Sequence, residues 1–173
     1  MMIPSSHMGA KTLISVEEYL RTPYESPEPD FVNGEIVERT MPNNPHSRAV
    51  IALIKALLRQ APDTLFERPE LRVRSVPGRY RVADLAVFDH DFIEEEPSHA
   101  PLIVVEVLSP AESHAELMRK FADYAAIGIP HIWLVDPIAK RFSIYHDESL
   151  TATTKLEVPE HGVSIRPSDI FTA

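Results

Sequence analysis

Apolar residues recur along this chain with two distinct periods, and these periods predict which segments are helices and which are strands. Spacings of three and four predict helices, whereas short apolar runs rich in β-branched residues predict buried strands. Helices are predicted at residues 15–21, 44–60 and 113–127. Strands are predicted at residues 65–75, 80–88, 102–108 and 131–136, and a strand pair at 31–40 turns at Asn33-Gly34. The weaker alternation at 141–146 and 154–158 predicts an edge hairpin.

The long predicted helix at 44–60 has an apolar stripe that we expect to face the core. The residues of this stripe are Val50, Ile51, Ile54, Leu57 and Leu58. The charged residues Arg48, Lys55 and Arg59 lie off the stripe, and Pro62 ends the helix.

The order of these segments indicates an α/β fold. The strand–helix–strand unit at 102–136 calls for a parallel crossover, whereas the tight turns elsewhere favour antiparallel neighbours. We therefore expect one α/β domain at residues 11–173, with a mixed β-sheet flanked by helices. Residues 1–10 are expected to be disordered or a cloning remnant, because they contain Ser5-Ser6-His7-Met8.

Composition narrows the class of protein. The chain has 173 residues, of which 44% are hydrophobic, which is enough for a buried core. It has no cysteine, which excludes disulfides, thiolate metal sites and cysteine nucleophiles. No apolar stretch reaches the length of a membrane span or of a signal peptide's core, so a cytoplasmic protein without membrane association is expected. The formal net charge of −9 argues against indiscriminate binding to nucleic acid.

Positive charge is nevertheless concentrated in one segment. Between residues 68 and 81 the only acid is Glu70, and the arginines there are Arg68, Arg72, Arg74, Arg79 and Arg81. One interpretation is a solvated hairpin, and the other is a ridge that faces the phosphates of a nucleic acid. On the second interpretation Arg72, Arg74 and Arg81 are candidate substrate-binding residues.

Two of the apolar strands each carry one acid, Asp84 in 82–88 and Glu106 in 102–108. An ionised and unpaired carboxylate there would cost roughly several kcal/mol, so each acid should be protonated, paired with a cation or bound to a metal. Consecutive strands usually lie side by side, so both carboxylates could share one Mg²⁺ ion. Two alternatives stay open: Asp84 lies at an exposed strand edge, and Glu106 forms an ion pair with a core arginine.

Lys120 lies on the face of the helix at 113–127 that we expect to point inward. Leu117, Phe121, Tyr124 and Ile127 form the apolar stripe of this face, and Lys120 falls within the same sector. A lysine on an inward face requires an anion, which could be the reacting phosphate or water beside Glu106. The alternative is a bridge to Glu116 one helical turn earlier.

Several short motifs, taken together, resemble the restriction-endonuclease-like family of the PD-(D/E)xK nuclease superfamily. The resemblance covers roughly residues 15–150. The motifs are Gly34-Glu35, His46, Arg81-Val-Ala-Asp-Leu-Ala-Val-Phe88, Val105-Glu-Val-Leu-Ser-Pro110, Lys120 with Tyr124, and Gly128-Ile-Pro-His-Ile-Trp-Leu-Val-Asp-Pro137.

The resemblance implies a restriction-endonuclease-like fold and Mg²⁺-dependent cleavage of DNA, with Mn²⁺ as an alternative cofactor. Asp84 and Glu106 match the two acids of the motif and would bind the metal, and Lys120 matches a lysine that this family places on the following helix. The superfamily's usual lysine position on the strand is Leu108 here, which is a departure. Ala83 replaces the usual proline before the first acid, which affects backbone shape and not metal binding.

Two further residues match the family less directly. Glu35 matches an N-terminal acid that could be a third ligand or orient water. His46 matches a recurrent histidine and is a candidate substrate-binding residue, with capping of the long helix as its alternative role.

The expected function is therefore a Mg²⁺-dependent endonuclease that hydrolyses DNA phosphodiester bonds. The resemblance also implies a homodimer, because nucleases of this fold often pair so that two sites meet both strands. The alternative is a non-catalytic nuclease fold that binds DNA or a protein partner, which the acidic net charge and the absent strand lysine favour. A glycosidase with paired carboxylates is a third hypothesis, disfavoured because a small sheet leaves little room for a sugar cleft.

Overall fold

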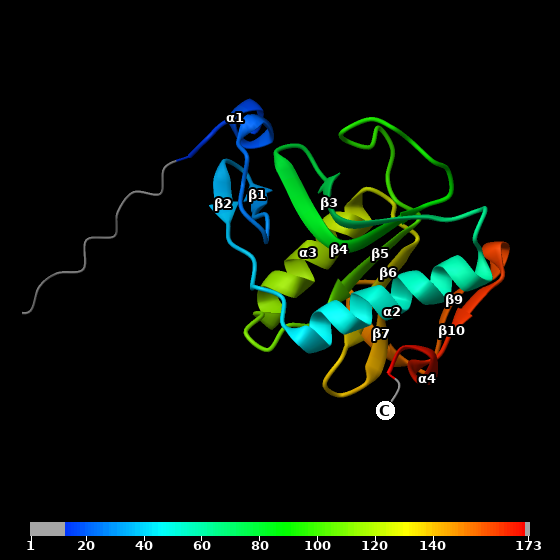
Figure 1. Ribbon diagram of the computed structural model, residues 1–173. Coiled ribbons are helices and arrows are strands. Elements are labelled where there is room, and N and C mark those ends of the chain that lie inside the picture. Colours follow the sequence, from blue (N-terminus) through cyan, green and yellow to red (C-terminus); the bar gives the residue numbers. More distant parts are fainter. Residues whose placement is uncertain (1–12, 172–173) are drawn as a thin grey trace, which may run out of the picture.

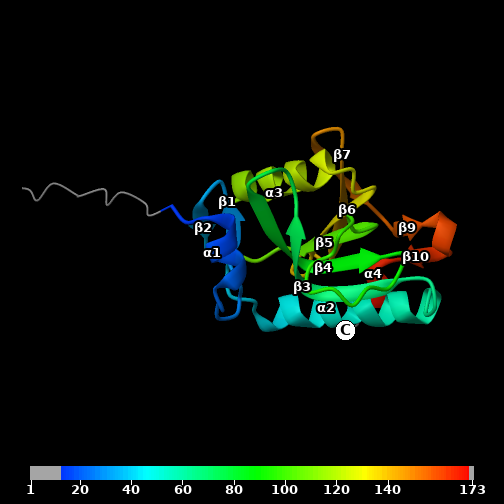
Figure 2. The same cartoon turned by 90° about the horizontal axis from the view of Figure 1, so that it is seen from above.

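A large sheet lies between two helices on opposite faces of it, α2 (Asn44–Gln60) and α3 (His114–Ala126), as Figure 2 shows. The structure is a computed structural model that describes residues 13–171. Helix α1 (Val16–Arg21) and the hairpin of β1 (Asp30–Val32) and β2 (Glu35–Val37) lie together at one end (Figure 1). The expectation for residues 1–10 concerns a segment outside the described residues.

The sheet is mixed, as the sequence predicts. The remaining strands are β3 (Phe66–Arg74), β4 (Arg79–Phe88), β5 (Ile103–Val107), β6 (His131–Asp136), β7 (Arg141–His146), β8 (Ser149–Thr153), β9 (Leu156–Val158) and β10 (Val163–Ile165). The strand order of the main sheet is β2-β1-β4-β5-β6-β7-β8, and β3 also pairs with β4. Strands β5 and β6 are parallel and are joined through α3, which confirms the predicted crossover.

Successive side chains of β4 and β5 point alternately toward α2 and toward α3, so both faces of these strands are buried. This is why their sequences are nearly continuous apolar runs. The cluster on the side of α2 includes Leu53, Leu57, Leu85, Val87, Val105 and Val107. The cluster on the side of α3 includes Ala86, Val104, Leu117, Phe121 and Tyr124. A polar residue on either strand is therefore buried unless it lies where the strands end.

The predicted apolar stripe of α2 is partly wrong. Ile51 and Leu58 are 53% and 45% exposed, whereas Ala49, Leu53, Ala56 and Leu57 are buried. The buried set follows the i, i+4, i+7, i+8 spacing of a helix face, and its two alanines allow a close approach to the sheet. Sequence hydrophobicity favoured the larger side chains over these alanines.

The predicted edge hairpin between residues 141–146 and 154–158 is also wrong. Strand β7 pairs instead with β8, through a two-residue turn at Asp147 and Glu148, both of which have positive φ. Such backbone angles are typical of tight hairpin turns, but Asp-Glu lacks the glycine that usually marks them. Strand β9 pairs with β10 in a separate small sheet that packs against α2, next to the short helices η1 (Pro159–His161) and α4 (Pro167–Ile170).

A buried arginine ties the N-terminal hairpin and α3 to the sheet. Arg81 on β4 is 1% exposed. Its Nε donates to Asp123 of α3 at 2.7 Å, and its Nη1 donates to Asp30 of β1 at 3.0 Å and to Glu116 of α3 at 2.9 Å. The second oxygen of Asp30 accepts the backbone N–H of Val82 at 2.8 Å. One cation therefore joins three elements distant in sequence.

We predict that Arg81→Met lowers the free energy of unfolding by about 3–5 kcal/mol, because Asp30 and Asp123 then stay buried without this cation. Arg79→Met is the matched control: its side chain is 32% exposed, and among residues 13–171 its one ion pair is with Asp123. The control should cost about 1 kcal/mol or less. Urea unfolding followed by circular dichroism measures both, and equal losses would contradict the role given to Arg81.

Candidate active site

The two strand acids meet where β4 and β5 separate. The paired register of these strands ends at Leu85 opposite Val105, and one further step places Asp84 opposite Glu106. Directly opposed residues share one face of a sheet, so both side chains point the same way. Asp84 is 5% and Glu106 is 2% exposed. The predicted proximity of the acids is thus present, and the alternative of an exposed edge for Asp84 is wrong.

Asp84 is held by three donors from different parts of the chain. Its Oδ2 accepts the backbone N–H of Val107 at 2.7 Å and contacts His46 Nε2 at 3.0 Å. Its Oδ1 accepts from Arg39 Nη2 at 2.7 Å. Because the N–H of Val107 bonds a side chain in place of a β4 carbonyl, the sheet opens at this point. Asp84 fills the opening.

Glu106 is held by two side chains of α3. Lys120 Nζ donates to its Oε2 at 2.7 Å, and the hydroxyl of Tyr124 donates to its Oε1 at 2.8 Å. Lys120 also donates to the backbone carbonyl of Val82 at 2.8 Å and is 4% exposed. The inward position predicted for Lys120 is therefore present. Glu116, the alternative partner, bonds Arg81 and Arg119.

The surroundings move the pKa values of these groups in different directions. Burial opposes ionisation of Asp84, but the hydrogen bond with His46 and the charges of Lys120 and Arg39 outweigh it and lower its pKa. For Glu106, burial together with the nearby charge of Asp84 outweighs Lys120 and Arg39 and raises the pKa to about 8. Burial also disfavours the charged form of Lys120, yet Glu106 and other acids raise its pKa. The site thus combines one firmly ionised acid with one that binds a proton readily.

Arg39 lies between the buried carboxylate of Asp84 and the more exposed carboxylate of Glu70. It follows β2, and its guanidinium donates to Asp84 and, at 2.6 Å, to Glu70 on β3. The side chain of Glu70 is 42% exposed, whereas that of Arg39 is 11% exposed. Arg39 therefore covers Asp84 from the outside and has a second acid to bind if it leaves Asp84.

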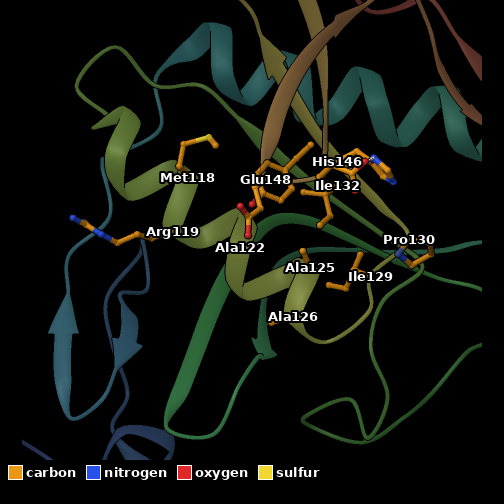
Figure 3. Close-up of a pocket in the computed structure, with 12 residues that line it drawn as sticks. Met118, Arg119, Ala122, Ala125, Ala126, Ile129, Pro130, Ile132, His146 and Glu148 are labelled. Carbon is orange, nitrogen blue, oxygen red and sulfur yellow. Dashed lines mark ion pairs between the residues drawn. The ribbon is translucent and has the colours of Figure 1, made fainter.

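These groups line a pocket of about 240 Å³ that is strongly acidic. Its acidic residues are Asp30, Glu38, Asp84, Glu106, Glu112 and Glu116, and its cationic ones are Arg39 and Lys120, with His46 beside them. A larger pocket of about 740 Å³ lies on another side of α3 (Figure 3). It is lined by residues such as Ala122, Ala125 and Ile129 and does not contain the strand acids.

The other predicted site residues lie at different distances from this pocket. His46 lines it, and its backbone N–H is capped by the side chain of Asn43 at 3.0 Å, so Asn43 and not His46 caps α2. Glu35 lies on β2 and is not among the described residues that line the pocket.

The predicted arginine ridge is mostly neutralised within the described residues. Its ion pairs are Arg68 with Asp91, Arg72 with Glu28, Arg79 with Asp123, and Arg81 with Asp30, Glu116 and Asp123. Arg81 is buried, Arg72 lies over the ring of Tyr19, and Arg74 is exposed on β3. In the part of the chain that the structure describes, none of these three arginines lines the acidic pocket, so the ridge and the pocket are separate features.

Arg39 and Glu112 are among the pocket residues that sequence reasoning missed. Arg39 lies near the end of the strand pair predicted at 31–40, and nothing in its neighbours marks it as a site residue. Glu112 lines the pocket between β5 and α3, and burial raises its pKa. Its place after a buried strand that carries an acid was a usable signal, because such a connection must pass over the carboxyl end of the strand.

The donor set fits a hard divalent cation that keeps several waters. A carboxylate has about four acceptor positions; Glu106 uses two of them and Asp84 three, so both retain capacity for a ligand bond. Mg²⁺ is often held by one or two carboxylates together with water. Among residues 13–171, no group of three or more histidines and acids is arranged for a metal ion. The protein therefore offers two ligands and not a closed cage.

Comparison with known proteins finds a family model and similar solved structures. A family model described as "Uma2: Putative restriction endonuclease" matches residues 16–173. A crystal structure described as a putative nuclease belonging to DUF820 from Anabaena variabilis is similar, with a TM-score of 0.79, 20% identity, and coverage of 91% of this chain and 97% of that chain. This likeness shows the fold alone and confirms the expected mixed sheet flanked by helices. No curated protein matches.

Within residues 13–171, no helix has both the length and the apolar character needed to pass through a bilayer.

We predict that Glu106 makes the free energy of unfolding fall as pH rises from about 5 to 8. The folded protein raises the pKa of Glu106 from 4.5 to about 8, so between these values the folded state binds more protons than the unfolded state. Glu106→Gln cannot titrate, so its stability relative to the wild type should improve across this range. Denaturant unfolding in EDTA at several pH values measures the difference, and a constant difference would contradict the raised pKa.

Proposed function

This chain belongs to the Uma2 family, described as putative restriction endonucleases, and we propose that it hydrolyses DNA phosphodiester bonds with a divalent metal ion held by Asp84 and Glu106. The membership confirms the resemblance found in the sequence and supports a nuclease. The metal dependence and the choice of DNA are proposals. One observation carries them: two buried carboxylates and the amine of Lys120 converge in one pocket.

The chemistry follows from where each group is held. A divalent cation bound there would polarise the phosphate and lower the pKa of a bound water. Lys120 Nζ is fixed between Glu106 and the carbonyl of Val82, so its charge lies beside the place where negative charge develops on the phosphate. Tyr124 fixes the other oxygen of Glu106. His46 and the N–H of Val107 fix one oxygen of Asp84, and the other, which accepts from Arg39, would be the one to bind the cation.

Arg39 has to be accommodated in this mechanism. It occupies the Asp84 oxygen that would otherwise be most open to a cation, and it also bonds Glu70. A cation arriving at Asp84 would weaken the bond with Arg39, whose guanidinium would keep its bond with Glu70 and become free to bind the incoming phosphate. Arg39 thus stabilises Asp84 in the absence of a cation and stays available for the substrate.

A non-catalytic nuclease fold is the second candidate function, and a specific observation favours it. Both carboxylates already bond cationic side chains, Asp84 with Arg39 and Glu106 with Lys120. Such pairs could be purely structural. The homodimer expected from the resemblance also remains a proposal, which sedimentation of the full chain would test.

We predict that calorimetric titration with Mn²⁺ finds one site in the wild type and that Asp84→Ala weakens its affinity at least about tenfold, because one of two ligands is lost. Asp91→Ala is the control, since Asp91 is a surface acid paired with Arg68. Negligible binding by the wild type would favour the non-catalytic function.

We predict that the protein nicks supercoiled plasmid in the presence of Mn²⁺ and that Lys120→Met reduces the rate about 10²–10³-fold, the usual effect of losing one charge that stabilises a transition state. Lys155→Met is the control and should leave the rate unchanged. Lys155 is an exposed lysine directly before β9, and it pairs with Glu157 within that strand. Gel electrophoresis of the nicked product measures both. Equal rates for the wild type and Lys120→Met would exclude the role given to this amine.

A further inference from the structure

A second pocket also borders the first turn of α2 and has the opposite charge. It has a volume of about 360 Å³ and is formed by the first turns of α2, the turn after β6 and the C-terminal segment; its lining includes Arg48, Lys140, Pro137 and Phe171. We propose that Arg48 and Lys140 bind the phosphate backbone of the nucleic acid next to the bond that is cut. This inference rests on the proposed function and adds a surface that positions the substrate.

The two pockets share one edge of the sheet. Strands β5 and β6 are parallel, so their carboxyl ends lie together, and Leu108 N–H bonds the carbonyl of Val135 at 2.8 Å. The segment after β5 supplies Ser109 and Glu112 to the acidic pocket, and the segment after β6 supplies Lys140 to the second one. A nucleic-acid strand lying along this edge would therefore touch both pockets.

Helix α2 links the pockets directly. His46, in its first turn, contacts Asp84 in the acidic pocket, and Arg48 lies two residues later and lines the second pocket. Because the positive end of the helix dipole lies at this turn, it adds to the charge of Arg48. Residues two apart lie on different sides of a helix, so the first turn of α2 stands between the two pockets and borders both.

Arg48 and Lys140 are unpaired cations. Both are exposed, and within residues 13–171 neither side chain has a hydrogen bond or ion pair. No acid is among the described residues that line their pocket. Asp136, the nearest acid in sequence to Lys140, accepts the backbone N–H groups of Ile138 and Ala139. Phosphate would therefore meet these charges without displacing a protein partner.

A phosphate backbone is the occupant that the charges favour. The chain is acidic overall, and acids outnumber cations in the pocket where the bond would be cut. A protein with a net charge of −9 repels a polyanion, so binding requires unpaired cations close to the site. Arg48 and Lys140 supply such cations at the same edge of the sheet. Most arginines of the 68–81 segment, in contrast, are already paired with acids.

The test is binding of a fluorescein-labelled DNA duplex, followed by anisotropy in EDTA so that no cleavage occurs. The double variant Arg48→Gln with Lys140→Gln should raise the Kd at least about tenfold at low salt and reduce the slope of log Kd against log salt by about two, one for each phosphate that is no longer neutralised. The matched control is Lys55→Gln with Arg59→Gln, which removes the same charge from exposed positions farther along α2. The control should change the Kd by less than about twofold.

Each outcome decides the inference. Thermal unfolding should be unchanged in both double variants, because the altered side chains are exposed and make no buried contacts. Weaker binding in the first variant alone supports the surface, whereas equal losses in both variants or no loss in either overturns it. If the wild type nicks plasmid and Asp84→Asn does not, while the Arg48 and Lys140 changes leave binding intact, this inference fails and the proposed function stands. No binding by the wild type in EDTA overturns this inference, and no nicking by the wild type with Mn²⁺ overturns the proposed function.

Discussion

Two carboxylates buried side by side impose the main constraint on this fold. Asp84 and Glu106 lie opposite each other on neighbouring strands, and neither could stay buried without donors for its oxygens. Five groups supply them: Arg39, His46, the N–H of Val107, Lys120 and Tyr124. Because these donors come from both helices and from the segment after β2, the acids fix how those elements sit on the sheet.

Arg81 is a buried charge that is also neutralised by its neighbours, but with the signs reversed. One buried cation is surrounded by three acids from β1 and α3, whereas two buried acids are surrounded by cations from α3 and from the segment after β2. The two networks meet on α3, where Glu116 and Asp123 serve Arg81 while Lys120 serves Glu106. Helix α3 is thus positioned by charge as well as by Leu117 and Phe121.

The sequence was most informative where local pattern and burial agree. The apolar runs around Asp84 and Glu106 predicted buried strands with acids in them, and the inward stripe of α3 placed Lys120 correctly because helix periodicity is strong there. The pattern failed where pairing over distance decides the result. The partner of β7, the contact of Arg39 with Asp84 and the neutralisation of the arginines all depend on residues that only the folded chain brings together.

The role of His46 was ambiguous in the sequence because its partner is also distant along the chain. A histidine in the first turn of a helix can cap that helix, but the side chain of Asn43 does so here, which leaves the imidazole for Asp84. Only the position of α2 relative to β4 distinguishes the two roles.

A crystal soaked in Mn²⁺ would decide whether Asp84 and Glu106 together hold a catalytic cation. We expect one anomalous-scattering peak about 2.1 Å from an oxygen of each carboxylate, with Arg39 moved away from Asp84. Well-diffracting crystals with no peak there, and with Arg39 still bonded to Asp84, would overturn the assignment.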